Sequence, residues 1–576
     1  MDINKRDLAT VVVLCIVFFS ITVWNLGLPQ SPTTTWQTSE NQSFYIDLGQ
    51  IESVDAVYLL VKNGSASVQT YAGSPESWSL GESLSVTWPY DYYSWSKIAV
   101  TESTRYIRFT FENVSVEVAE VAVLSQNYQK IPVVSVIGEN ASSQDLPKLN
   151  DEQSLVECPP TYLSETFFDE VYYVRTAENY LRLEYPYEWT HPPLGKLIIS
   201  LGIVAFGYNP FGWRIMGVIF ATLMLPFVYL LGKKLFGTWI GALACTFLFT
   251  FDFMHFTMAR MATVDTFVVF FSLASQVFFL TYIKDVIKKG WSTTIFPLVL
   301  GFVFFALGFS TKWLVLYGFA GLIVFLLILR LREVMELKEG LSKRLSAIMD
   351  YPFYWLPLLL LIAIFIYFLT FIPDMLAGRS IIDVLGIQGS MFIYHSTLTA
   401  THPFSSPWWS WPIIQRPVWL YISYLPFNTK STISLLGNPA IWWAGFASVI
   451  FVAIKAIPTR YLKKIPKISH LLAKVDLKPD TAALFIAIVF FFQWLPYVLI
   501  SRITFIYHYY VSVPFLCLAS AYLINKVWGR KWGKMITVIF FALVVLLFAL
   551  FFPVISGTPT SSTSIDSLKW FESWVF

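Results

Sequence analysis

The feature that most constrains this chain is a series of apolar segments, each about as long as a membrane-spanning helix. A helix needs about 20 apolar residues to cross the hydrocarbon layer of a bilayer. Such segments recur along the 576 residues, of which 56% are hydrophobic and only 13% are charged. A soluble globule would not expose so much apolar surface. We therefore expect a polytopic α-helical membrane protein.

Eleven segments meet this criterion: Leu8–Leu28, Phe211–Leu231, Trp239–Phe256, Thr263–Ile283, Ile295–Phe309, Trp313–Leu329, Phe353–Ile372, Pro439–Ala456, Thr481–Ile500, Phe505–Ile524 and Met535–Pro553. The first follows Lys5 and Arg6 but is longer than a signal-peptide core, so we interpret it as a retained anchor. One further run, Leu194–Phe206, is too short for a typical span. Runs of this length are more often interfacial or re-entrant helices.

The positions of Lys and Arg decide the orientation. If Leu194–Phe206 stays on the outer surface, the inner loops contain 23 of the 40 basic residues. This distribution agrees with the positive-inside rule, whereas counting Leu194–Phe206 as a span would invert every later loop and break it. We expect the N-terminus to be cytoplasmic and the C-terminal tail to be outside.

A polar, Ser/Thr-rich region separates the first span from the rest. Residues 29–160 alternate apolar and polar side chains, as in 106–111, and contain turn signals such as Asn63-Gly64. We expect an inserted extracytoplasmic β-sandwich domain, and residues 104–125 resemble the closing strands of galactose-binding-like jelly rolls. All four Asn-x-Ser sequons lie in this region, which fits an outer location.

Charge and cysteine usage exclude other classes. The 40 basic and 37 acidic residues nearly balance, so nucleic acid is not an expected partner. The four cysteines are scattered, and three lie in apolar segments. Neither a disulfide framework nor a cysteine-rich metal site is supported.

One stretch collects unusual polarity beside the membrane. Residues 167–196 contain the acid pair Asp169 and Glu170, a His191-Pro-Pro turn and Lys196. With the orientation above, a set of polar residues maps to the outer side: Asp169, Glu170, His191, Arg214, His255, Arg260, Asp265, Lys312, His395, His402, Arg416, Arg502 and His508. Charged groups are costly to place near a bilayer, so the set indicates one outward-facing functional site.

The acid pair has two interpretations that the residues alone leave open. Acids in a first helical turn are stabilised by the helix dipole, so Asp169 and Glu170 could simply cap a helix. Alternatively, an outward carboxylate removes a proton from an acceptor, while Arg214, at the outer interface, stabilises the phosphate of a lipid-linked donor. The second interpretation predicts a transferase that uses a sugar on a polyprenyl phosphate.

Several separated motifs resemble one family. Residues 167–196, 213–237, 252–271 and 306–313 are similar to the catalytic membrane half of protein O-mannosyltransferases, which have the C-class glycosyltransferase (GT-C) fold. Residues 391–421 and 502–516 resemble the C-terminal four-span region of that family. The resemblance implies inverting transfer of mannose from dolichyl-phosphate mannose to Ser or Thr of a protein. The outer loop 373–438 is too small for the MIR modules of eukaryotic members, so the resemblance implies a prokaryotic, archaeal-type enzyme of the cell membrane.

The resemblance also assigns roles to individual residues. It implies that Asp169 is the general base, that Glu170 positions substrate and that Arg214 binds the donor phosphate. The remaining positions are expected to support the site or bind substrate: His191, Lys196, Arg260, Asp265, Lys312, His395 and His402.

No cofactor is expected, because two adjacent acids without further clear carboxylate ligands are a weak metal signature; a divalent metal is the alternative. The expected partners are the lipid-linked sugar, the acceptor protein and membrane lipid, with a homodimer as one expected assembly. Two other functions stay open: transfer of another polyprenyl-linked sugar to a lipid or glycan, and transport. No internal repeat supports transport, and the charges lie at one face of the membrane.

These interpretations divide the chain into seven parts. They are a first span (1–28), the β domain (29–160), a catalytic outer loop with juxtamembrane helices (161–210), a membrane core (211–372), an outer loop (373–438), C-terminal spans (439–553) and an outer tail (554–576).

Overall fold

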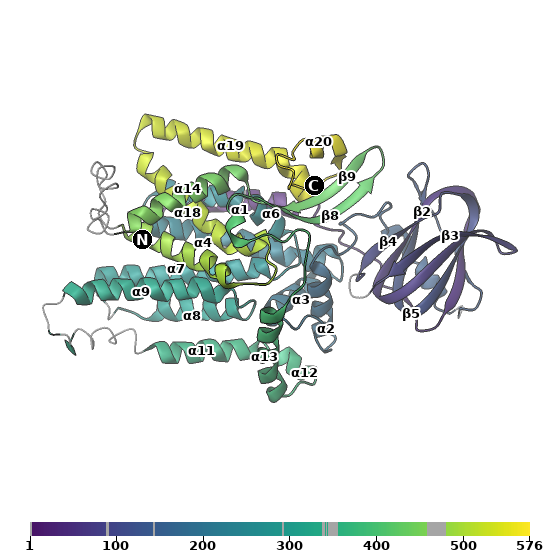
Figure 1. Ribbon diagram of the computed structural model, residues 1–576, viewed down its shortest axis with the longest axis horizontal. Helices are drawn as coiled ribbons and strands as arrows, with labels where there is room; N and C mark the ends of the chain where they lie inside the picture. The colour runs from purple at the N-terminus through teal and green to yellow at the C-terminus, as the bar shows by residue number, and fades with distance from the viewer. Residues whose placement is uncertain are drawn as a thin grey trace.

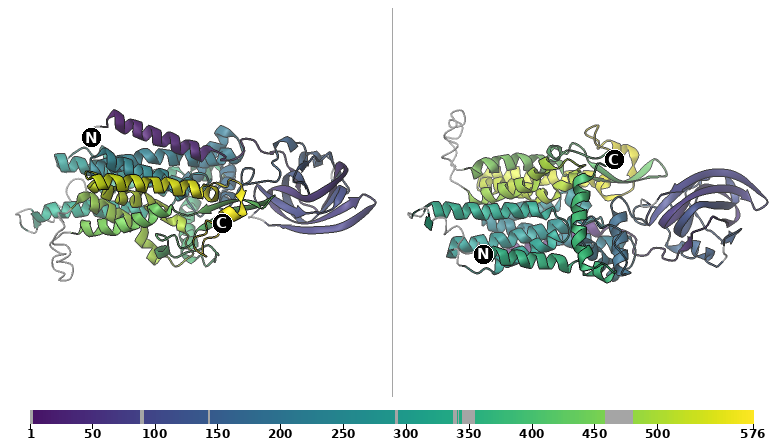
Figure 2. Two further views of the ribbon diagram at one scale, coloured as in Figure 1. Left: turned by 90° about the horizontal axis from the view of Figure 1, so that it is seen from above. Right: turned by 60° about the horizontal axis from the view of Figure 1, so that its bottom comes forward.

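The computed structural model describes residues 3–87, 91–141, 144–290, 293–336, 340, 342–343, 355–457 and 480–576. Its helices run side by side in one bundle, and a β domain extends from one end of that bundle (Figure 1). The N-terminus lies at the opposite end of the bundle from the β domain, and the C-terminus lies at the same end as the β domain (Figures 1 and 2). The chain therefore crosses the length of the bundle an odd number of times.

Eight helical segments among the described residues are long and apolar enough to cross a membrane. They are α1 (Lys5–Val23), α4 (Pro210–Phe236), α7 (Asp265–Lys289), α9 (Val315–Glu336), α14 (Pro439–Ala456), α17 with the 3-10 helix η5 (Thr481–Leu499), the 3-10 helix η6 with α18 (Ile506–Val527) and α19 (Lys531–Ser556). Two apolar helices of 14 residues complete the bundle, α8 (Phe296–Phe309) and α11 (Leu356–Leu369). The expected span start at Phe353 and most of the basic loop 455–478 lie outside the described residues.

The expected span Trp239–Phe256 contains a sharp bend. It consists of α5 (Trp239–Thr250) and α6 (Phe253–Ala259), which meet at an angle of 59°. Asp252 causes the break: its carboxylate accepts a hydrogen bond from the backbone N–H of His255 at 3.1 Å and another from Trp442 Nε1 at 2.8 Å. An aspartate in this position is a helix N-cap, so a new helix begins there.

Three helices outside the spans cover the end of the bundle that faces the β domain. They are α2 (Glu170–Leu181), α3 (Leu194–Phe206) and α13 (Ile381–Thr397), and α13 runs across the direction of the spans (Figure 1). At 1.5 Å per residue, the 13 residues of α3 extend only about 20 Å. That length is short of the hydrocarbon thickness, which agrees with an interfacial helix.

The β domain consists of seven antiparallel strands that hydrogen bond as one sheet. The long strands β2 (Gln42–Ser74) and β5 (Ser103–Ser125) form its centre, and the others pair along them: β1 (Trp36–Thr38), β3 (Ser77–Val86), β4 (Ser94–Ala99), β6 (Lys130–Ile131) and β7 (Ser135–Gly138). The first half of β5 pairs with two separate parts of β2, so the sheet folds over its own core. The expected sandwich is built from one hydrogen-bonded sheet that folds over itself, with Trp36, Phe44 and Phe111 packed inside.

Polar contacts join the β domain to α2. Tyr92 donates a hydrogen bond to Glu178 of α2 and contacts the hydroxyl of Tyr208 at 2.7 Å. Lys62 Nζ lies 3.6 Å from Glu178 Oε1. The backbone N–H of Thr166 donates to the carbonyl of Tyr93 at 3.0 Å, only three residues before Asp169. The β domain therefore fixes the loop that leads into α2.

The C-terminal tail closes the same end of the bundle. Its strand β10 (Thr560–Ser561) pairs with β9 (Thr429–Leu435), which pairs with β8 (Val418–Leu425). The helix α20 (Ser562–Asp566) follows, and Lys430 forms an ion pair with Asp566 at 2.9 Å. The tail is therefore part of the outer cover of the bundle.

Candidate active site

Asp169 lies immediately before α2, and its carboxylate is not used as a helix cap. The side chain is partly exposed, and no donor among the described residues bonds to the carboxylate. Burial, with a further contribution from the negative charge of Asp265, raises the pKa of Asp169 to about 7, although Lys312 opposes the shift. A carboxylate with that pKa can accept a proton near neutral pH, so the geometry favours the base over the cap.

Glu170 and Arg214 form a fully buried, bidentate ion pair. Arg214 Nε and Nη2 donate to the two carboxylate oxygens at 2.8 and 2.7 Å. The other donors of Arg214 bond to the backbone carbonyls of Leu26, Tyr162 and Glu165. A guanidinium has five N–H donors, and all five are used here. The expected roles of Arg214 as a phosphate ligand and Glu170 as a substrate-positioning acid do not fit this arrangement, which instead ties the loop before α2 to α1 and α4.

Glu188 organises the His-Pro-Pro turn. The buried Lys196 donates to the Glu188 carboxylate at 2.7 Å and to the carbonyls of Glu188 and His191 at 2.8 and 2.6 Å. Burial alone would raise the pKa of Glu188, but the positive charge of Lys196 and the hydrogen bond from His191 hold it well below its usual range. All three N–H donors of Lys196 are thereby used within the turn, so Lys196 stabilises the conformation of the turn.

His191 is neutral near pH 7, because burial lowers its pKa despite the nearby Glu188. Its Nδ1 lies 3.0 Å from Glu188 Oε1, so Nδ1 carries the proton and Nε2 remains an acceptor. The rings of His191 and His395 lie 5.0 Å apart. His395 Nε2 bonds to the carbonyl of Thr190 at 2.8 Å, and burial lowers the pKa of His395 to about 4.

A cavity of about 630 Å³ opens beside this turn. His191 and His395 line it together with Lys312, Arg502 and His508. Its other walls are largely apolar and come from α8, α9, α13, the 3-10 helix η5 (Leu495–Leu499) and the link between α8 and α9, with residues such as Trp313 and Leu499. A polar rim over apolar walls suits an amphipathic ligand.

Two cations of this cavity differ in their partners. Lys312 forms an ion pair with Asp265 at 2.9 Å, and its Nζ lies 5.8 Å from the ring centre of Tyr507. Arg502 is partly buried and makes no ion pair within the described parts of the chain. Arg502 is therefore the cation that remains available to an anion in this cavity.

Arg260 and His402 are among the expected residues that do not line the cavity. Arg260 donates to the carbonyls of Thr22, Trp24, Asn25 and Ser556, so it joins the end of α1 to the end of α19. The ring of His402 lies 5.1 Å from that of Phe505, and its Nδ1 accepts from the backbone of Phe404. Arg260 therefore stabilises the packing of these helix ends. His402 does not line the cavity.

Sequence reasoning missed Glu188 and gave Arg502 no role. Glu188 stands three residues before His191, a spacing that can bring two side chains together in a turn. Nothing in the sequence distinguishes Arg502 from other cations at span ends. Only the three-dimensional structure shows that Arg502 makes no ion pair with the described residues. Among the described residues, no group of three or more His, Cys, Asp or Glu side chains is arranged to hold a metal ion.

The helical bundle is that of an integral membrane protein with the GT-C glycosyltransferase fold. A chain of the *S. cerevisiae* protein O-mannosyltransferase Pmt1-Pmt2 complex bound to the sugar donor has a similar fold, with a TM-score of 0.58 and 14% identity. The similarity covers 71% of this chain and 89% of that chain.

Sequence comparisons identify the family. Residues 190–349 match the model of dolichyl-phosphate-mannose-protein mannosyltransferases, and residues 381–574 match the C-terminal four-span region of protein O-mannosyltransferases. The polyprenol-phosphate-mannose–protein mannosyltransferase of *Corynebacterium glutamicum* is 26% identical over 67% of this chain and 81% of that protein. Its *Mycolicibacterium smegmatis* counterpart is 24% identical over 72% and 89%. The chain belongs to the protein O-mannosyltransferase family.

Proposed function

We propose that this protein is an inverting glycosyltransferase that moves mannose from a polyprenyl phosphate to Ser or Thr hydroxyls of a protein, on the outer face of the membrane. The observation that carries the proposal is Asp169, an unbonded carboxylate with a pKa raised to about 7 in the outer loop of a chain from this family. The names of the bacterial relatives support both the donor and the protein acceptor.

The reaction is a single displacement at the anomeric carbon. Asp169 takes the proton of the acceptor hydroxyl while the oxygen of that hydroxyl bonds to C1 of mannose. The bond from C1 to the phosphate oxygen breaks on the opposite side, so the configuration inverts and polyprenyl phosphate leaves. Such a displacement needs one base and no enzyme nucleophile.

We propose Arg502 as the ligand of the departing phosphate, in place of Arg214. A guanidinium without a protein partner can form two parallel hydrogen bonds to a phosphate. Lys312 lies in the same cavity, but Asp265 neutralises much of its charge. The apolar walls of the 630 Å³ cavity suit the first isoprene units of the donor lipid.

The charged side chains in this arrangement can provide both general-base catalysis and stabilisation of the leaving group without a metal. Asp169 provides the base, and Arg502 with Lys312 provides the positive charge at the leaving group. We therefore propose metal-independent transfer, which predicts full activity in the presence of EDTA.

The test uses purified protein with radiolabelled mannosyl polyprenyl phosphate and a Ser/Thr-rich peptide. The proposal predicts label in the peptide, released by β-elimination because the linkage is to a hydroxyl. Label that enters lipid or glycan and never enters peptide would overturn protein O-mannosylation and favour transfer to another acceptor.

A further inference from the structure

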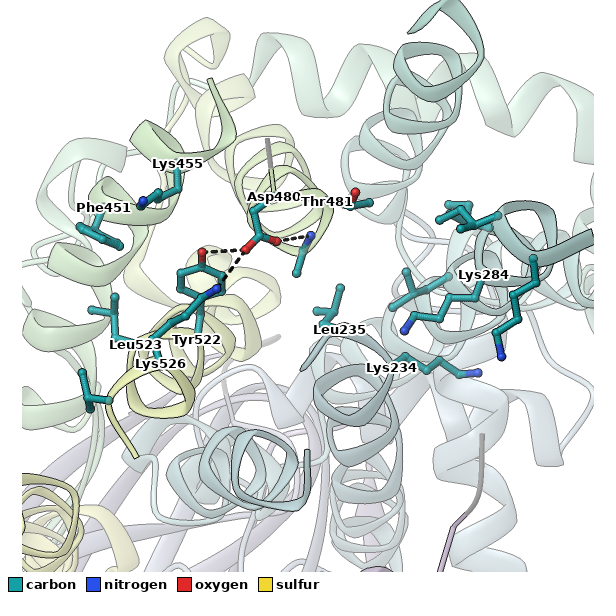
Figure 3. Close-up of a pocket in the computed structure, with 16 residues that line it drawn as sticks. Lys234, Leu235, Lys284, Phe451, Lys455, Asp480, Thr481, Tyr522, Leu523 and Lys526 are labelled. Carbon is teal, nitrogen blue, oxygen red and sulfur yellow. Dashed lines mark hydrogen bonds and ion pairs between the residues drawn. The ribbon is translucent and has the colours of Figure 1, made fainter. Parts of the chain in front are cut away.

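A second, larger cavity of about 910 Å³ lies at the end of the bundle opposite the candidate active site. α4 begins beside the Glu170–Arg214 pair and ends at Phe236, about 40 Å away at 1.5 Å per residue. The C-terminal ends of α4, α7, α14 and α18 and the N-terminal end of α17 enclose the cavity (Figure 3). The mechanism proposed above uses none of these residues.

Positive charge dominates this cavity. Lys234 and Lys284 stand on one side of it, and Lys455 and Lys526 stand on the other (Figure 3). With Lys288, the lining has five lysines and one acid, Asp480, so its net charge is 5 − 1 = +4.

The single acid is already engaged. Asp480 Oδ1 accepts from the backbone N–H groups of Ala482 and Ala483, and Oδ2 accepts from Tyr522 at 2.8 Å and lies 3.7 Å from Lys526 Nζ. Within the described residues, Lys234, Lys284 and Lys288 form no ion pair, although Asp285 follows Lys284 on α7. Helix dipoles and the positive-inside rule explain lysines at this end of the helices, but not their convergence on one cavity.

The rest of the cavity wall is largely apolar. It includes Leu235, Leu280, Ile283, Phe451, Leu523 and Val527. An inorganic anion would gain nothing from these side chains, whereas a lipid would place its headgroup among the ammonium groups and its chains against the wall. The combination of lysines and apolar side chains therefore favours an amphipathic anion over a fully polar one.

We propose that this cavity binds an anionic membrane phospholipid, from the leaflet in which α1 begins, with its phosphate held by Lys234, Lys284 and Lys455. The cavity joins α4 and α7 on one side to α14, α17 and α18 on the other. These two sets of helices lie in the regions that match the two separate family models. The bound lipid therefore fastens the two halves of the membrane region together.

The test measures thermal unfolding of the whole purified protein in a neutral detergent. Added phosphatidylglycerol should raise Tm by at least about 2 °C, and phosphatidylcholine should not. In the variant Lys234→Gln/Lys284→Gln/Lys455→Gln, the concentration of phosphatidylglycerol needed for half of the shift should rise at least about tenfold. Native mass spectrometry of the same samples should show one retained anionic lipid in the parent protein and none in the variant.

The matched control is Arg530→Gln/Lys531→Gln/Lys534→Gln, which removes the same charge near the start of α19 from residues that do not line the cavity. It should respond to phosphatidylglycerol as the parent protein does. Equal shifts with both lipids, or an unchanged response of the cavity variant, would overturn the proposal. A shift produced by millimolar inorganic phosphate alone would also overturn it, because the ligand would then be a soluble anion.

Discussion

Asp169 and Glu170 are adjacent, yet their carboxylates lie in opposite environments. Glu170 is fully buried and saturated by Arg214 and by the backbone N–H of Ala262. Asp169 is partly exposed, and its carboxylate has no hydrogen-bond partner among the described residues. The buried pair fixes the backbone, so the free carboxylate next to it is held in one position without being neutralised.

The pH dependence of transfer should follow the ionisation of Asp169. A base acts in its deprotonated form, so kcat/KM should rise with pH and level off above about pH 7. Asp265→Asn removes a negative charge that raises the pKa of Asp169 and leaves Lys312 unpaired. The pH at which kcat/KM reaches half of its maximum should then fall by about one pH unit. A midpoint that stays in place, in a variant with parental Tm, would exclude this coupling.

Arg214 and Arg502 should respond differently to the same substitution. Arg214→Gln leaves Glu170 buried without its partner, so it should lower the free energy of unfolding by about 3–5 kcal/mol. Arg502→Gln should leave Tm near the parental value but raise KM for the donor by about tenfold. A raised donor KM in a well-folded Arg214 variant would restore the phosphate role that the sequence predicts for it.

At this scale the sequence predicts which residues are polar and on which side they lie, but not their partners. Asp169 stands out because an acid beside a membrane is costly. The pairing of Glu170 with Arg214 joins residues 44 positions apart, and no local pattern encodes it. Glu188 is missed for the same reason, since its importance comes from Lys196 and His191 converging on it.

Among the elements, α3 brings the His-Pro-Pro turn against the start of α7. Gly195 makes this possible: a Cβ there would lie 2.6 Å from Val264 Cγ1 and 3.0 Å from Thr311 Cγ2. Val264 and Thr311 are the neighbours of Asp265 and Lys312. The close approach of α3 therefore affects the position of the Asp265–Lys312 ion pair, of which Lys312 lines the cavity.

Gly195→Val should push α3 away from that pair. Overpacking of this kind costs about 1–3 kcal/mol, and we expect a lower Tm together with slower transfer. Gly389→Ala in α13 is the control, because a Cβ there meets nothing within 4 Å. Parental activity in Gly195→Val would show that the placement of α3 does not affect the site.

Helices that follow from the length of an apolar run are predictable from the sequence. Features that follow from a single tertiary contact are not. The eleven apolar runs correspond to eight long helical segments, one bent pair and two 14-residue helices. The apolar length of Trp239–Phe256 does not predict the break between α5 and α6, where Asp252 caps α6 and also accepts a hydrogen bond from the distant Trp442.

At the scale of the whole molecule, the two proposed ligand sites lie at opposite ends of one bundle. The candidate active site lies at the end that faces the β domain, and the lysine-lined cavity lies at the other end. Single cysteines in a variant without the four native ones test this layout. A membrane-impermeant maleimide applied to intact cells should label Glu184→Cys after α2 but not Lys289→Cys at the end of α7. The opposite pattern would contradict the proposed orientation.

The central claim is that Asp169 is the base for mannose transfer to protein. Its most direct test is single-turnover transfer from mannosyl polyprenyl phosphate to a Ser/Thr peptide by Asp169→Asn, compared with Glu184→Gln, an exposed acid after α2. The account predicts a rate lower by about 10²–10⁴-fold for Asp169→Asn, with donor binding and Tm retained, and a parental rate for Glu184→Gln. A parental rate for Asp169→Asn would contradict it.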